Sequence, residues 1–137
     1  FTFASALNEK IIEPETQFLN LPKSIPCDKF EIGEYSDDIP SDLTAEQILI
    51  RSGNVGSVKI AQKVGPDNLK LFLEKIGILN KIEFDIEEVG KPQAIDWYQG
   101  CKLETVSYGQ GITTTIFILQ SSNSNIIPAY TLHSLFV

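Results

Sequence analysis

Segment 44–77 constrains the fold most, because three helical patterns follow one another within it. The first begins with Thr44 and Gln47 in the spacing of a capping box, and it predicts a helix over 45–51. The second has an apolar residue at every third position over 55–64, which suits one face of a helix. The third follows directly after a Gly-Pro pair. The segment therefore predicts three helices in succession.

The third pattern is the most regular. Pro66 stands at a favoured first helical position, and Gly77 closes the helix. Between them apolar residues recur at i, i+3, i+4 and i+7, which gives this helix one apolar face: Leu69, Phe72, Leu73 and Ile76.

The patterns before this segment are weaker. Residues 1–12 indicate the end of a helix with apolar residues four apart on one stripe: Phe3, Leu7 and Ile11. Residues 17–42 contain three prolines and many polar residues, and they predict extended chain with one short strand at 29–32.

The patterns after the segment predict a few strands. Residues 82–86 alternate and fit a short strand or an extended arm. A loop over 90–100 has Trp97 as its apolar anchor. Residues 112–119 are β-branched and apolar, which is typical of a strand. The predicted fold class is therefore α+β, and mainly α.

Composition excludes several functions. The 137 residues fit one domain or part of one, and a net charge of −7 argues against a nucleic-acid partner. The single histidine, His133, has no cysteine or histidine neighbour, so we expect no metal site and no cofactor. Cys27 and Cys101 lack metal-type spacing, and both a disulfide and two unpaired thiols fit the sequence.

The two ends of the chain suggest how it arose. The chain contains no methionine and begins with Phe1 inside a helical pattern, so we expect it to be a piece of something longer. No stretch is long and apolar enough to span a membrane, and there is no signal-peptide pattern.

Ser52, Gly53 and Asn54 separate the first two predicted helices. At such a junction the side chains of Ser52 and Asn54 can point towards a ligand. The same triplet can also serve as a cap and turn, because serine and asparagine are common in both. The triplet alone does not decide between these two interpretations.

Three motifs occur in a fixed order: SGNVG at 52–56, LFLEKIGI at 71–78 and SYGQGI at 107–112. In residue type, order and spacing they resemble the transpeptidase domain of penicillin-binding proteins. The resemblance covers residues 1–117. The short linker over 90–97 is most similar to that of the monofunctional class B branch, which makes septal or elongation peptidoglycan.

The resemblance implies a penicillin-binding-protein/beta-lactamase-like fold, of which this chain holds mainly the helical lobe. It implies a D,D-transpeptidase that cross-links peptidoglycan through a serine acyl-enzyme. In that scheme Ser52 relays a proton to or from the reacting amine, and Asn54 holds the substrate amide. Gly53, Gly109 and Gly111 are expected to form structural turns.

The resemblance also implies partners and a location. The intact parent would bind peptidoglycan stem peptides and β-lactams, and would take part in cell-wall synthesis or cell division. It would face the periplasm, anchored in the inner membrane by a segment absent here. The sequence leaves a septal and an elongation role equally open.

The chain departs from the family in two motifs, since it contains no Ser-x-x-Lys and no Lys-Thr-Gly. We therefore expect a partial transpeptidase domain over 1–117 that is inactive by itself. Without a covering sheet, its face of Leu69, Phe72 and Ile76 should stay partly exposed. The likeness ends after Phe117, and we expect 118–137 to be a divergent tail left by a frameshift or a decayed gene end.

Two alternatives stay open. A serine β-lactamase or a D,D-carboxypeptidase would share the fold, although the Gly-Gln-Gly element and the segment after it argue against both. A non-catalytic interaction domain, or the inert remnant of a gene, would use Ser52 and Asn54 only as helix caps. The orientation of these side chains separates the interpretations, because a shared cleft favours the catalytic family.

Overall fold

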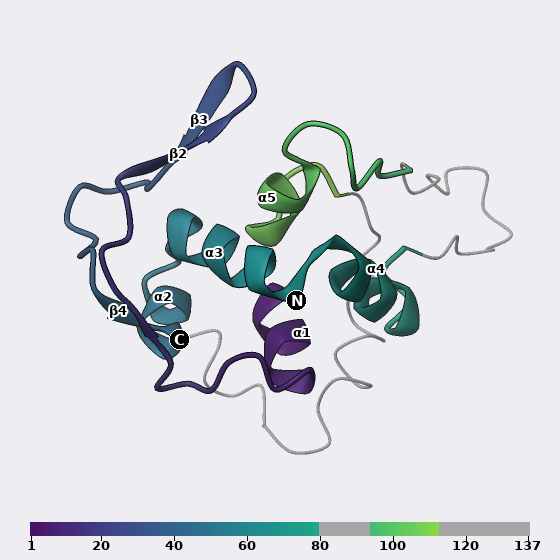
Figure 1. Ribbon diagram of the computed structural model, residues 1–137, viewed down its shortest axis with the longest axis horizontal. Helices are drawn as coiled ribbons and strands as arrows, with labels where there is room; N and C mark the ends of the chain where they lie inside the picture. The colour runs from purple at the N-terminus through teal and green to yellow at the C-terminus, as the bar shows by residue number, and fades with distance from the viewer. Residues whose placement is uncertain (80–93, 113–137) are drawn as a thin grey trace, which may run out of the picture.

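The computed structural model describes residues 1–79 and 94–112, in which short elements surround one central helix (Figure 1). The described helices are α1 (Thr2–Asn8), α2 (Ala45–Ile50), α3 (Asn54–Val64), α4 (Pro66–Lys75) and α5 (Lys102–Ser107). Short strands form two antiparallel pairs: β1 (Gln17–Phe18) with β4 (Leu43–Thr44), and β2 (Ser24–Cys27) with β3 (Phe30–Gly33). The mixed α+β class with more helix than strand is confirmed. No helix in the described ranges could cross a membrane.

Helix α3 lies at the centre of this arrangement. Helices α1, α2, α4 and α5 all contact it, and Figure 1 shows α1 and α5 on opposite sides. It can be surrounded because its buried positions are apolar or small: Val55, Gly56, Ser57, Val58, Ile60, Ala61 and Val64. The four apolar residues spaced three apart in the sequence are therefore all buried, and the buried surface of α3 also includes Gly56, Ser57 and Ile60.

The predicted start of α2 is confirmed in detail. The Thr44 hydroxyl accepts a hydrogen bond from the Gln47 amide at 3.1 Å, and the Gln47 side chain accepts one from the Thr44 amide at 2.9 Å. This reciprocal pair is the capping box that the sequence predicted. The break between α3 and α4 is also confirmed, with Gly65 at φ 81° and Pro66 opening α4.

Helix α4 buries the apolar face that its sequence predicts. Leu69 and Leu73 are 0% and 1% exposed, and Ile76 is also buried. Phe72 is half-buried as expected, whereas the expectation that this face stays partly exposed is wrong for Leu69 and Ile76. The reason is that the main core covers them: Trp97, the predicted loop anchor, is buried in the same cluster together with Ile78 and Val106.

Helix α1 is shorter than predicted and presents a different face. It ends at Asn8, and its buried residues are Thr2, Ser5 and Ala6. Leu7, which belonged to the predicted apolar stripe, is 46% exposed. Small side chains allow α1 to approach α3 closely, and for this reason the large apolar residues do not mark the contact face.

Segment 17–42 contains more strand than predicted. Strands β2 and β3 form a hairpin in which Ser24 pairs with Gly33 and Cys27 pairs with Phe30. Figure 1 shows this hairpin projecting from the group of helices. One side of it packs against α3 through a small apolar cluster: Ile25, Cys27, Ile32, Val55 and Val58.

Cys27 and Cys101 form a disulfide, with their Cα atoms 5.5 Å apart. The bond joins the end of β2 to the residue that precedes α5, a helix that the sequence analysis did not predict. The hairpin is therefore attached to the group of helices at two places.

Several predictions lie outside the described residues. These are the strand at 82–86, the strand at 112–119 except for Ile112, and the divergent tail at 118–137. The boundary at residue 117 between domain and tail therefore stays a prediction.

Candidate active site

The loop that joins α2 to α3 begins with a Schellman motif. The Ser52 amide donates to the Leu49 carbonyl at 3.1 Å, and the Gly53 amide donates to the Ile48 carbonyl at 2.9 Å. This pair of bonds places a left-handed residue just after the helix cap, where glycine is usual. In this chain Ser52 fills the position, with φ 51°.

The left-handed backbone at Ser52 is unfavourable for a residue with a Cβ atom, by about 1 kcal/mol or more. Gly53 has φ −65° and ψ 118°, which any residue can adopt. The glycine expected to permit this turn is therefore not the residue with the unusual backbone. Strain that is kept at a polar residue points to a need for its side chain.

The N-terminus of α3 is capped by a residue from outside the loop. Glu34 accepts hydrogen bonds from the Asn54 amide at 2.7 Å and from the Val55 amide at 3.1 Å, one with each carboxylate oxygen. Gly53, the N-cap residue, supplies no side-chain bond. Ser52 and Asn54 are thus not the residues whose side chains cap this helix.

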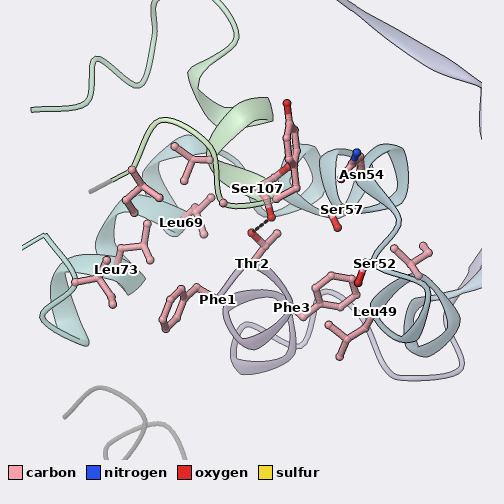
Figure 2. Close-up of a pocket in the computed structure, with 16 residues that line it drawn as sticks. Phe1, Thr2, Phe3, Leu49, Ser52, Asn54, Ser57, Leu69, Leu73 and Ser107 are labelled. Atoms are coloured by element: carbon pink, nitrogen blue, oxygen red, sulfur yellow. Dashed lines mark hydrogen bonds between the residues drawn. The ribbon is translucent and has the colours of Figure 1, made fainter. Parts of the chain in front are cut away.

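Ser52 and Asn54 line the same pocket, which has a volume of about 490 Å³ (Figure 2). Ser57 lies one turn further along α3, lines the pocket as well, and donates its hydroxyl to the Gly53 carbonyl at 2.7 Å. Three polar side chains, one from the loop and two from the first turn of α3, therefore belong to the pocket lining. Most of the remaining lining is apolar: Phe1, Phe3, Ile48, Leu49, Leu69, Leu73, Ile78, Val106 and Ile112.

Another part of the lining is built where α1 meets the end of α5. The Thr2 hydroxyl donates to the Ser107 carbonyl at 2.8 Å, in a buried bond that Figure 2 shows as a dashed line. Tyr108 follows in the lining, and burial raises the pKa of its phenol, so it stays protonated at neutral pH. Gly109 and Gly111 have φ 93° and 72°, as turn glycines do.

The polar groups of this mostly apolar pocket can recognise a ligand. Its lining includes no lysine, histidine or carboxylate among the described residues. No side chain of these three kinds can therefore activate Ser52 as a nucleophile there. A hydroxyl and a carboxamide can instead relay a proton and hold an amide, since a carboxamide both donates and accepts.

A sequence model described as "Penicillin binding protein transpeptidase domain" matches residues 1–128. The chain belongs to the penicillin-binding protein transpeptidase family. The family resemblance expected from the sequence is thereby confirmed.

The curated relatives of this transpeptidase-family chain are much longer than it is. It is 26% identical to penicillin-binding protein PbpB of Mycolicibacterium smegmatis over 117 residues. The alignment covers 84% of this chain and 18% of that protein. The chain thus spans under a fifth of this relative.

Solved structures show the fold of the transpeptidase family. The apo transpeptidase domain of penicillin-binding protein 3 from Burkholderia pseudomallei has a TM-score of 0.76 and 22% identity, covering 90% of this chain and 38% of that one. Penicillin-binding protein 3 of Mycobacterium tuberculosis, complexed with aztreonam, has a TM-score of 0.73 and 18% identity, covering 88% and 27%. At these identities the likeness concerns the fold alone.

The structure brings together some of the expected transpeptidase residues and adds others. Ser52, Asn54 and Gly109 line one pocket, whereas Gly53 and Gly111 lie outside its lining. Sequence reasoning missed Glu34 and Ser57. A serine in the middle of an apolar helical face was an available signal for Ser57, but nothing local to Glu34 indicated its contact with a loop 20 positions away.

Proposed function

We propose that this chain supplies the Ser-x-Asn loop (Ser52, Gly53 and Asn54) of a peptidoglycan D,D-transpeptidase site. The observation that carries the proposal is that Ser52 and Asn54 share a pocket, while Glu34 rather than either of them caps α3. Both side chains are therefore available to a ligand. The Asn54 side chain donates to the Gly33 carbonyl at 3.0 Å, which fixes one end of the carboxamide and leaves its oxygen to accept from a substrate amide.

The proposed reaction is acyl transfer between two peptidoglycan stem peptides. A serine attacks the carbonyl of a D-Ala-D-Ala end, the terminal D-alanine leaves, and the amine of a second stem peptide then displaces the serine. Ser52 passes a proton to the departing amine or from the entering one. Asn54 holds the peptide amide of the acyl donor in position.

The nucleophile of this proposal comes from outside the 137 residues, because they contain neither Ser-x-x-Lys nor Lys-Thr-Gly. We propose that the intact protein contributes these motifs on either side of the cleft. β-Lactams would acylate the same nucleophile. The site would then lie on the periplasmic face of an anchoring membrane, in cell-wall synthesis or cell division.

The first test is the nucleotide sequence on both sides of this reading frame, translated in all frames. Codons for a Ser-x-x-Lys motif just upstream and for a Lys-Thr-Gly motif downstream, even in a shifted frame, would support a transpeptidase site. If neither motif is found, the proposal fails, and the chain is better regarded as a non-catalytic interaction domain.

The second test uses a fluorescent penicillin on the longest natural form of the protein. Ser52→Ala and Asn54→Ala should each slow covalent labelling by roughly 100-fold, the size expected for loss of a general acid–base or positioning group. The matched controls are Ser41→Ala and Asn8→Ala, at exposed positions outside the pocket lining. Labelling at the unsubstituted rate in both site variants would contradict the proposal.

A further inference from the structure

The β2–β3 hairpin ends directly beside the Ser-x-Asn loop. Glu34, the residue after β3, binds the Asn54 amide at 2.7 Å and the Val55 amide at 3.1 Å. The preceding residue, Gly33, accepts a hydrogen bond from the Asn54 side chain at 3.0 Å. Two consecutive residues of the hairpin therefore hold both the backbone and the side chain of Asn54.

The carboxylate of Glu34 suits its place better than a neutral side chain would. Its two oxygens each accept one N–H group at the start of α3, where the helix dipole favours negative charge. Charge-assisted hydrogen bonds of this kind are the stronger class. The Glu34 carboxylate also lies close to Gly53, because a Cβ atom added to Gly53 would be 3.6 Å from Glu34 Oε1.

The hairpin is well fixed relative to the pocket. Ile25 and Ile32 pack against Val55 and Val58 on α3. At its other end, the disulfide from Cys27 ties the hairpin to the residue preceding α5, the helix whose end lines the pocket. The contacts of Glu34 thus fix the position of Asn54 relative to the hairpin, which is itself held against α3 and α5.

We infer that Glu34 is a positioning residue for the transpeptidase reaction, acting through Asn54 and the Ser-x-Asn loop. The inference rests on the proposed function, because it assigns Glu34 a task only if Asn54 meets the substrate. Glu34 itself does not line the pocket, so it does not touch the reacting groups. Its task is to set the direction in which the Asn54 carboxamide enters the pocket.

The test substitutes Glu34 in the longest natural form of the protein. Glu34→Gln keeps one acceptor oxygen but turns an NH2 group towards the second backbone N–H. Glu34→Asp keeps both oxygens on a shorter side chain, so it should lose less of the labelling rate than Glu34→Gln does. The matched control is Glu31→Gln on the same hairpin, because Glu31 is exposed and accepts only from the Ser24 hydroxyl among the described contacts.

Two readouts are measured at a temperature where all variants are fully folded. The rate of labelling by a fluorescent penicillin should fall about 10- to 100-fold in Glu34→Gln, as for a small misplacement of a positioning group, and stay unchanged in Glu31→Gln. Amide hydrogen exchange at Asn54 and Val55 should be about tenfold faster in Glu34→Gln. A merely structural role would lower the melting temperature without changing the labelling rate of folded protein.

The outcomes separate this inference from the proposed function. If Ser52→Ala and Asn54→Ala slow labelling but Glu34→Gln matches Glu31→Gln, the positioning role is overturned and the proposed function stands. Unchanged exchange at Asn54 and Val55 in Glu34→Gln would also overturn it. If the unsubstituted protein is not labelled at all, the proposed function fails and the positioning role fails with it.

Discussion

Cys27 and Cys101 are joined by a disulfide across 74 positions of the sequence, and this bond connects the β2–β3 hairpin to the start of α5. Both elements contribute to the surroundings of the pocket, the hairpin through Glu34 and α5 through Ser107 and Tyr108. The bond therefore couples the stability of the fold to the geometry of the candidate site.

Reducing this disulfide should destabilise the chain substantially. The chain-entropy model gives roughly 4 kcal/mol for closing a loop of 74 residues. Urea unfolding with and without dithiothreitol measures the change in the free energy of unfolding. The control is the Cys27→Ala/Cys101→Ala double variant, whose unfolding should not respond to the reductant. An unchanged midpoint for the natural chain would mean that the bond does not form in solution.

Replacing Ser52 by glycine should stabilise the chain, by about 0.5–1 kcal/mol net of the flexibility that glycine adds to the unfolded state. The reason is the left-handed backbone at Ser52, which glycine adopts without a Cβ clash. Ser52→Ala keeps the Cβ atom and should leave the free energy of unfolding nearly unchanged. Chemical unfolding of the two variants measures the difference, and a Ser52→Gly variant less stable than Ser52→Ala would contradict the assignment of strain.

Gly56 should not tolerate a side chain. A Cβ atom built there would lie 2.5 Å, 2.7 Å and 2.8 Å from three side-chain atoms of Ile48, closer than real atoms approach. We expect Gly56→Ala to cost about 1–3 kcal/mol of stability through overpacking. Gly33→Ala is the control, because its nearest neighbour would be a carbonyl oxygen at an ordinary 3.8 Å.

A double-mutant cycle assigns the Gly56 effect to Ile48. If the clash is the cause, Ile48→Ala combined with Gly56→Ala should cost less than the sum of the single changes, by about 1 kcal/mol or more. Additive costs would place the cause elsewhere in the core.

The helices around the Ser-x-Asn loop were predictable because their signals are local. The capping box of Thr44 and Gln47 acts over three residues, and the break at Gly65 and Pro66 acts over two. Such signals do not depend on where the rest of the chain lies. The order α2, loop, α3, break and α4 could therefore be read before any coordinates were known.

The β2–β3 hairpin and the contacts that hold the Ser-x-Asn loop were not predictable in the same way. Strand β2 contains Pro26, which weakens a strand signal, and the hairpin turn at Asp28 and Lys29 lacks the usual glycine. The contact of Glu34 with Asn54 and the pairing of Cys27 with Cys101 depend on tertiary placement. Helix α1 was misjudged for a related reason, since its contact face consists of small residues rather than large apolar ones.

Loss of the Thr2 hydroxyl should weaken the junction between α1 and α5. Thr2→Val keeps the shape of the side chain but leaves the buried Ser107 carbonyl without its 2.8 Å partner, at a cost of about 1–3 kcal/mol. Thr16→Val is the comparison, because the Thr16 hydroxyl accepts a hydrogen bond from the Glu13 amide in an exposed turn, where water can replace the hydroxyl. Equal losses in the free energy of unfolding would show that the buried hydrogen bond stabilises the chain no more than the exposed one does.

The 137-residue chain by itself should not be labelled by a fluorescent penicillin. Covalent labelling needs a nucleophile with an activating base, and the chain has no Ser-x-x-Lys, while the described pocket lining has no basic or acidic side chain near Ser52. Gel fluorescence after incubation measures the labelling, with heat-denatured chain as the background and an active penicillin-binding protein as the positive control. Labelling that disappears in Ser52→Ala but persists in Ser57→Ala would show Ser52 to be a nucleophile, and the relay role proposed for it would then be wrong.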